Sequence, residues 1–99
     1  MAHPALVMRV RFRSNLSFGE VAAIVEERAP EFEALPGLLQ KYYLEDTVSG
    51  DVAGLYLWDS PEALAEYRDS DLKVSIARAY QAEAEPDIEI FKVFKVLRD

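Results

Sequence analysis

Three arginines alternate with apolar residues near the start of the chain, in the segment ALVMRVRFRS (residues 5–14). In an extended strand, Arg9, Arg11 and Arg13 would share one face and the apolar residues the other. The cluster is unusual because the chain carries a formal net charge of −7. Such cations could hold a small anionic ligand through charge-assisted hydrogen bonds. They could equally face water or form salt bridges at an interface, because alternation establishes only a shared face.

A lysine and four aromatic residues form a second group. Lys41 could hold a developing oxyanion, as could Arg9 and Arg11, or it could pair with an acid on a neighbouring strand. The side chains that could stack on an aromatic ligand are Tyr43, Tyr56, Trp58 and Phe94. Tyr56 and Trp58 could instead be ordinary core or interface residues. His3, the only histidine, lies at the N-terminus, where we expect disorder rather than catalysis, so a clear general base is missing.

The composition excludes several classes of site. The chain has no cysteine, which rules out disulfides, thiolate zinc sites, iron–sulfur clusters and cysteine nucleophiles. We expect no metal and no other cofactor. The acidic balance argues against nucleic acid and anionic membranes as partners, because both attract basic patches. The first ten residues resemble neither a signal nor a transit peptide, and no apolar run reaches membrane length. We therefore expect a cytoplasmic protein.

The pattern along the chain predicts alternating strands and helices. Residues 5–13 have the period of a strand. Ser17 and Glu20 have capping-box spacing, which predicts a helix from about Phe18 that Pro30 should kink or restart and Pro36-Gly37 should end. Ser60-Pro61-Glu62 is typical of another helix start. The remaining predicted segments are strands 37–45 and 52–58, joined as a hairpin by DTVSGD, helices 61–69 and 72–83, and strand 88–96.

This order, β-α-β-β-α-β, predicts a single α+β domain over residues 1–99 with a ferredoxin-like, four-stranded antiparallel sheet and helices on one face. The last strand is apolar on both faces, so Phe91, Val93 and Leu97 need cover that two helices cannot give. A second copy of the chain is the economical cover, and we expect a homodimer.

The same fold places the first strand near the centre of the sheet. On that basis the arginines should lie beside Tyr56 or Trp58 and the last strand. We expect Arg11, in mid-strand, to meet the ligand, and Arg13, at the strand end, to pair with an acid or with water. A buried arginine without such a partner would be costly.

A distributed motif covers residues 36–67, PGLLQKYYLEDTVSGDVAGLYLWDSPEALAEY. It begins with Pro-Gly, an apolar pair and a lysine. A Gly-aromatic-apolar run, an acidic-Ser cap and a helix ending in an aromatic residue follow. The matching residues are Pro36, Gly37, Leu39, Lys41, Gly54, Tyr56, Leu57, Ser60 and Tyr67. Together with FGE after the first strand and KVFKV in the last, the sequence resembles the YdhR-like monooxygenase family of dimeric α+β barrels. Gln40, where an aromatic residue is common, and Ala53, in place of the first of two glycines, depart from the pattern.

The resemblance implies a homodimer whose sheets face each other in a barrel, with a cleft between each sheet and its own helices or neighbouring loops. It also implies a monooxygenase that needs neither flavin nor metal, which would act here on a small aromatic, phenolic or enolic substrate. Such chemistry requires deprotonation, a positive group for the oxyanion and a dry cavity. The candidate catalytic residues are Lys41 and Arg11; the candidate substrate-binding residues are Arg9, Tyr43, Tyr56, Trp58 and Phe94.

Two other functions fit the same fold. Haem-degrading relatives need a helical imidazole ligand, but residues 61–83 contain no histidine. A non-catalytic dimeric module that binds a small hydrophobic anion is the alternative that remains open.

Overall fold

The computed structural model describes residues 3–99 and confirms the predicted α+β, ferredoxin-like order, with three short helices where the sequence predicts the two helical segments 61–69 and 72–83. The elements are β1 (Leu6–Phe12), α1 (Phe18–Glu33), β2 (Leu38–Glu45), β3 (Val52–Trp58), α2 (Pro61–Arg68), α3 (Asp71–Val74), α4 (Ile76–Ala79) and β4 (Asp87–Lys92). The strands form one antiparallel sheet in the order β2-β3-β1-β4. β1 is therefore internal, as expected.

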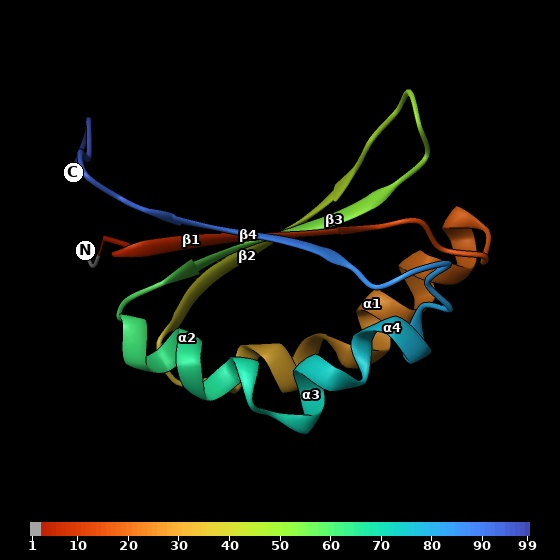
Figure 1. The fold of residues 1–99 in the computed structure, drawn as a ribbon, viewed down its shortest axis with the longest axis horizontal. Helices are drawn as coiled ribbons and strands as arrows, with labels where there is room; N and C mark the ends of the chain where they lie inside the picture. Colours follow the sequence, from red (N-terminus) through yellow and green to blue (C-terminus); the bar gives the residue numbers. More distant parts are fainter. Residues whose placement is uncertain (1–2) are drawn as a thin grey trace.

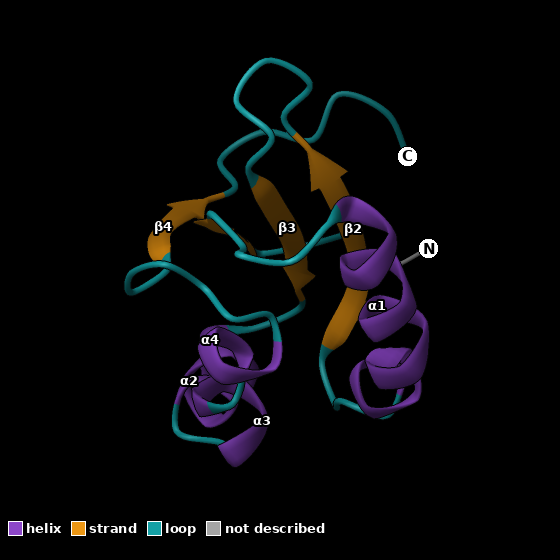
Figure 2. Ribbon diagram, turned by 90° about the vertical axis from the view of Figure 1, so that its right-hand side faces the viewer, coloured by secondary structure: helices purple, strands orange, loops and turns teal. Residues whose placement is uncertain are grey.

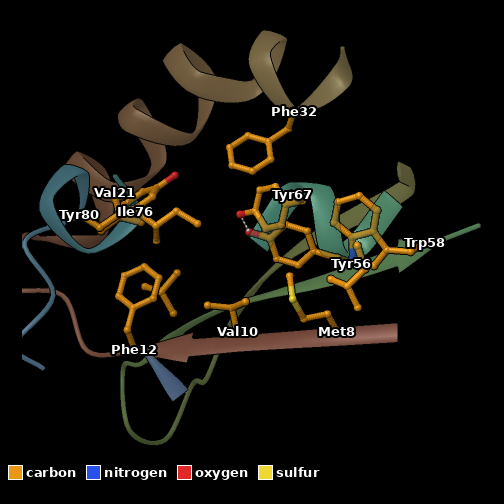
Figure 3. Close-up of a cluster of buried hydrophobic side chains, with 12 residues drawn as sticks. Met8, Val10, Phe12, Val21, Phe32, Tyr56, Trp58, Tyr67, Ile76 and Tyr80 are labelled. Carbon is orange, nitrogen blue, oxygen red and sulfur yellow. Dashed lines mark hydrogen bonds between the residues drawn. The ribbon is translucent and has the colours of Figure 1, made fainter. Parts of the chain in front are cut away.

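All helices lie on one side of the sheet (Figure 1). α1 lies beside β2, and α2, α3 and α4 lie together on the other side of the helical layer (Figure 2). The buried side chains between the sheet and the helices form one cluster, much of it drawn in Figure 3: Met8, Val10, Phe12, Val21, Phe32, Val52, Tyr56, Trp58, Leu64, Tyr67, Ile76 and Tyr80. The strand residues in this cluster fall at every second position, which is the period of a half-buried strand.

Local signals in the sequence explain where the two longer helices begin. The capping box at the start of α1 is complete: Ser17 Oγ accepts from the Glu20 backbone, and the Glu20 carboxylate accepts from the Ser17 backbone. Ser60 caps α2 with Pro61 at its first position. α1 does not restart at Pro30, because this proline lies in the last turn of the helix, where few intrahelical bonds follow it.

The predicted helix 72–83 is broken into α3 and α4, each of four residues. Ser75 lies at the break and its hydroxyl donates to the Leu72 carbonyl, a local bond that competes with helical pairing. Beyond α4, Gln81 has a positive φ of 49°, which turns the chain away from a helical path.

The last strand is shorter than the predicted range of 88–96. β4 pairs only with β1, and Lys92 lies opposite Leu6, the first residue of β1. Past this point one more backbone bond forms, from Val93 N–H to the Ala5 carbonyl, and the chain then leaves the sheet. Phe94 lies outside the strand with 96% of its surface exposed.

The sheet face that points away from the helices carries exposed apolar side chains. Tyr42, Leu44 and Phe91 are 51%, 44% and 53% exposed, and their register places them on this face. The turn between β2 and β3 rises on the same side, and so does the C-terminal segment (Figure 1). We call this surface the open face. Within residues 3–99, no helix is long and apolar enough to cross a membrane.

Candidate active site

Lys41 lies on the helix-facing side of β2 and is surrounded by aromatic rings. Its register partner is Tyr56 of β3. The Lys41 Nζ is 3.4 Å from the centroid of the Phe32 ring, 4.3 Å from that of Tyr43 and 4.4 Å from that of Tyr56. No carboxylate in residues 3–99 lies within ion-pair distance of it. The side chain is therefore enclosed by rings and is not part of a structural salt bridge.

This environment changes the chemistry of the lysine. Burial, assisted by the positive charge of Arg28, lowers the pKa of Lys41 to about 7 from its ordinary value near 10.5. Near neutral pH a large fraction of Lys41 is then an uncharged amine that can accept a proton. With this pKa, Lys41 is the candidate for the general base that could not be identified from the sequence.

An open cleft of about 320 Å³ leads to Lys41 between β2 and α1. Its lining includes Phe32, Glu33, Gln40, Lys41 and Tyr43. A cavity of about 20 Å³ lies further in and shares Lys41 and Tyr43 with the cleft. Lys41 therefore stands where the solvent-accessible cleft meets the interior of the protein.

The inner cavity is lined in part by Tyr56, which belongs to a pair of buried tyrosines. The hydroxyl oxygens of Tyr56 and Tyr67 are 3.3 Å apart and hydrogen-bond to each other (Figure 3). Burial raises the pKa of Tyr56 well above its usual range and raises the pKa of Tyr67 to about 12. Burial also raises the pKa of Tyr43 to about 12. These hydroxyls remain protonated at neutral pH and can donate hydrogen bonds.

Gly54 makes the close packing of Lys41 and Tyr56 possible. A Cβ atom on Gly54 would lie 3.0 Å from Tyr56 Cε1 and 3.4 Å from Lys41 Cε. The first distance is tighter than ordinary side-chain contacts, so a larger residue would displace the tyrosine ring or the lysine stem. The glycine in the distributed motif thus has a steric role in the site.

Two of the predicted ring-stacking residues line neither the cleft nor the inner cavity. Trp58 is completely buried and its ring stacks parallel to Tyr56 with centroids 6.2 Å apart. It also packs against Tyr67 at 5.3 Å, so it supports the tyrosine pair from behind. Phe94 lies in the exposed C-terminal segment and does not line the Lys41 cleft.

The arginines lie on the open face. The expectation that they lie beside Tyr56 or Trp58 is wrong, because Arg9 is opposite Leu55 and Arg11 opposite Ala53, and alternate residues of β3 point to opposite faces. The structure therefore does not bring Arg9 and Arg11 together with Lys41.

Each of these arginines has an acidic partner on the open face. Arg9 pairs with Glu89, and Arg11 Nη2 lies 2.6 Å from Asp46 Oδ2. Arg11 holds the pKa of Asp46 well below its usual range through this bond. Arg13 Nε donates to Asp51 at 2.9 Å, which confirms the expected acidic partner at the strand end. The Arg11 and Arg13 pairs join β1 to the β2–β3 turn, and the Arg9 pair joins β1 to β4.

The sequence patterns did not indicate Phe32, Tyr67 or Arg28 as residues of the site. Phe32 and Tyr67 both pack in the core, but the Phe32 ring also contacts Lys41 and the Tyr67 hydroxyl bonds to that of Tyr56. Arg28 lies four residues before Phe32 in the predicted helix, so a cation on the same helix face as an apolar residue was the signal that could have indicated it. In residues 3–99, no three acidic or histidine side chains converge into a possible metal site.

Comparisons with known proteins agree with this fold. A family model described as "Putative mono-oxygenase ydhR" matches residues 7–99. Rv0793 from Mycobacterium tuberculosis is 14% identical, with a TM-score of 0.74 over 94% of this chain and 98% of that one. SnoaB, a cofactor-independent oxygenase from Streptomyces nogalater, is 14% identical, with a TM-score of 0.75 over 95% and 97%.

A third solved structure contains a ligand. The monooxygenase from the gene ActVA-Orf6 of Streptomyces coelicolor, in complex with Nanaomycin D, is 18% identical, with a TM-score of 0.71 over 97% of this chain and 93% of that one. At these identities the structures establish a shared fold. No curated protein matches the chain.

Proposed function

Because this chain belongs to the ydhR mono-oxygenase family, we propose that it is a cofactor-independent monooxygenase that acts on a small phenolic or enolic substrate. The observation that carries the proposal is Lys41, a lysine with a pKa lowered to about 7 at the end of an aromatic-lined cleft. Support also comes from two structures of the same fold, SnoaB and the ActVA-Orf6 protein, whose descriptions name oxygenases.

The reaction begins with a proton transfer. The uncharged Lys41 amine takes the hydroxyl proton of the phenol, and the resulting ammonium holds the phenolate oxygen. The phenolate is electron-rich and reacts with O2 at a ring carbon that carries hydrogen, forming a carbon–oxygen bond and, after protonation, a hydroperoxide.

The second half of the reaction releases water. The ring carbon loses its hydrogen as a proton, the O–O bond breaks, and hydroxide leaves as water while a quinone carbonyl forms. The sum is phenol plus O2 giving quinone plus water. The substrate supplies all four electrons, so no external reductant enters the balance.

Each wall of the cleft has a role in this scheme. The rings of Phe32 and Tyr43 lie 3.4 and 4.3 Å from the Lys41 Nζ and reduce its contact with water. The Tyr56 and Tyr67 hydroxyl pair lies deeper and offers a hydrogen-bond donor to an oxygen of the bound intermediate. Arg11 and Arg9 lie on the other face of the sheet, where Arg11 holds the β2–β3 turn through Asp46 and Arg9 holds β4 through Glu89.

The homodimer and the cytoplasmic location expected from the sequence are part of this proposal. The exposed Tyr42, Leu44 and Phe91 side chains support dimerisation, because a second copy related by a two-fold axis would cover the open face with its own. The paired arginines on this face would then lie within the barrel formed by the two sheets.

Oxygen consumption tests the function. The purified protein, treated with a chelator and free of flavin absorbance, is mixed with a panel of phenols and quinols in an oxygen electrode. We expect O2 uptake with at least one compound, matched mole for mole by quinone, and a loss of at least tenfold in Lys41→Met. Stoichiometric binding across the panel without O2 uptake would instead support the non-catalytic ligand-binding module.

A further inference from the structure

Arg28 differs from every other arginine of residues 3–99. Arg9, Arg11 and Arg13 have acidic partners, and the arginines at positions 68, 78 and 98 are exposed. Arg28 is partly buried, and no carboxylate lies within ion-pair distance of it. In a chain with a net charge of −7, a sheltered arginine without an acid requires an explanation.

The position of Arg28 relates it to the Lys41 cleft. It lies on α1, one turn before Phe32, whose ring contacts the Lys41 ammonium. Its Nη2 donates to Ser75 Oγ at 2.8 Å and to the Leu72 carbonyl at 3.4 Å. The side chain therefore crosses from α1 to the α3–α4 segment, over the interior between the two groups of helices. Its Nε is buried and has no hydrogen-bond partner.

Two cations thus share one region, and Glu33, which lines the cleft, forms an ion pair with neither of them. The charge of Arg28 acts on Lys41 and also on the tyrosines at positions 43, 67 and 80, where it opposes the rise in pKa that burial causes. The acids whose charges act on Tyr43, Glu26 and Glu33, are both exposed on α1. Partly desolvated charges of one sign are costly, and a bound anion would offset that cost.

We propose that Arg28 is a positioning residue that makes the Lys41 cleft bind a phenol or enol as its oxyanion. This role rests on the proposed function, and it specifies that the site binds its ligand in the ionised, oxyanion form. Before binding, the fixed charge of Arg28 favours the amine form of Lys41. After proton transfer, the same charge stabilises the phenolate beside the lysine ammonium.

Equilibrium binding of 4-nitrophenol tests this role without turnover. Its phenolate is yellow and its phenol is not, and the nitro group makes the ring too electron-poor to reduce O2. 4-Nitroanisole is the control ligand, because it has nearly the same shape and no acidic proton. Affinity and the pH at which the bound ligand turns yellow are measured for the wild type and for Arg28→Lys, Arg28→Met and Arg28→Gln. Gln keeps a donor for Ser75 but carries no charge.

The charge at position 28 should affect the binding of the acidic ligand and not that of the neutral one. Arg28→Met and Arg28→Gln should lose about tenfold in affinity for 4-nitrophenol, with the colour change shifted up by about one pH unit, and bind 4-nitroanisole as the wild type does. Arg28→Lys should retain most of the wild-type preference. Equal loss for both ligands in all variants, or unchanged 4-nitrophenol binding in Arg28→Gln, would overturn the proposal. The expected binding pattern without O2 uptake by any phenol would refute the monooxygenase function alone.

Discussion

Replacing Lys41 with methionine should stabilise the protein, by an amount that depends on pH. Methionine has a similar length and places an apolar chain against Phe32, Tyr43 and Tyr56, where the wild type places an amine that must be partly desolvated. The lowered pKa of Lys41 is the measure of that cost, because it expresses how much less tightly the folded protein holds the proton than the unfolded chain does.

The size of this stabilisation follows from the shift in the pKa of Lys41. A change from 10.5 to about 7 corresponds to about 5 kcal/mol at about 1.4 kcal/mol per unit. Contacts between the ammonium and the three rings offset about 1–2 kcal/mol of this. We therefore expect Lys41→Met to raise the free energy of unfolding by about 3 kcal/mol at pH 6.

The sign of the pH dependence of stability depends on whether the folded or the unfolded state binds more protons. Between pH 7 and 10.5 the unfolded chain holds the Lys41 proton and the folded protein does not, so wild-type stability rises with pH across this window. Below pH 7 both states are protonated and the full penalty applies. The advantage of Lys41→Met should therefore be largest below pH 7 and shrink steadily towards pH 10.

Urea unfolding at pH 6, 8 and 10, at one fixed protein concentration, measures this difference. Lys41→Arg is the matched control, because arginine stays charged and should be less stable than Lys41→Met at every pH. A stability difference between Lys41→Met and the wild type that is the same at pH 6 and pH 10 would refute the reasoning about the buried amine.

Three further predictions concern other parts of the molecule. Phe91→Asp, on the open face, should convert a particle of twice the chain mass in light scattering into a monomer; a monomeric wild type would contradict the dimer. Gly54→Ala should lower stability by about 1–3 kcal/mol through the contact with Tyr56, and a neutral result in thermal unfolding would show that the site relaxes freely. Arg11→Ala should leave the affinity for a phenol within twofold of the wild type, as Arg13→Ala should; a selective tenfold loss in Arg11→Ala would move the ligand to the open face.

The elements of the fold could be predicted from sequence because their signals are local. The capping box at Ser17 and Glu20 and the serine and proline at positions 60 and 61 are complete within a few residues, and the structure confirms both helix starts. The end of β4 could not be predicted this way. The apolar alternation continues to Val96, but β4 ends at Lys92, opposite Leu6, where its only neighbour, β1, begins.

The site was harder to predict because it depends on which side chains meet across the sheet and across layers. Alternation correctly placed Arg9 and Arg11 on one face, but it could not place Tyr56 on the opposite one until the register of β1 and β3 was known. The lowered pKa of Lys41 arises from burial beneath Phe32, a residue of another layer. The lysine type is visible in the sequence, but its ability to act as a base is a property of the folded structure.

The central claim, that Lys41 is the base that activates the substrate, is tested most directly by the pH dependence of O2 consumption. With a phenol that the wild type oxidises, kcat/KM should rise with pH through about 7 and level off above it, as the amine form of Lys41 becomes populated. Lys41→Met should lose this rise together with most of the activity. Wild-type rates in Lys41→Met, or the same rise with pH in that variant, would contradict the account.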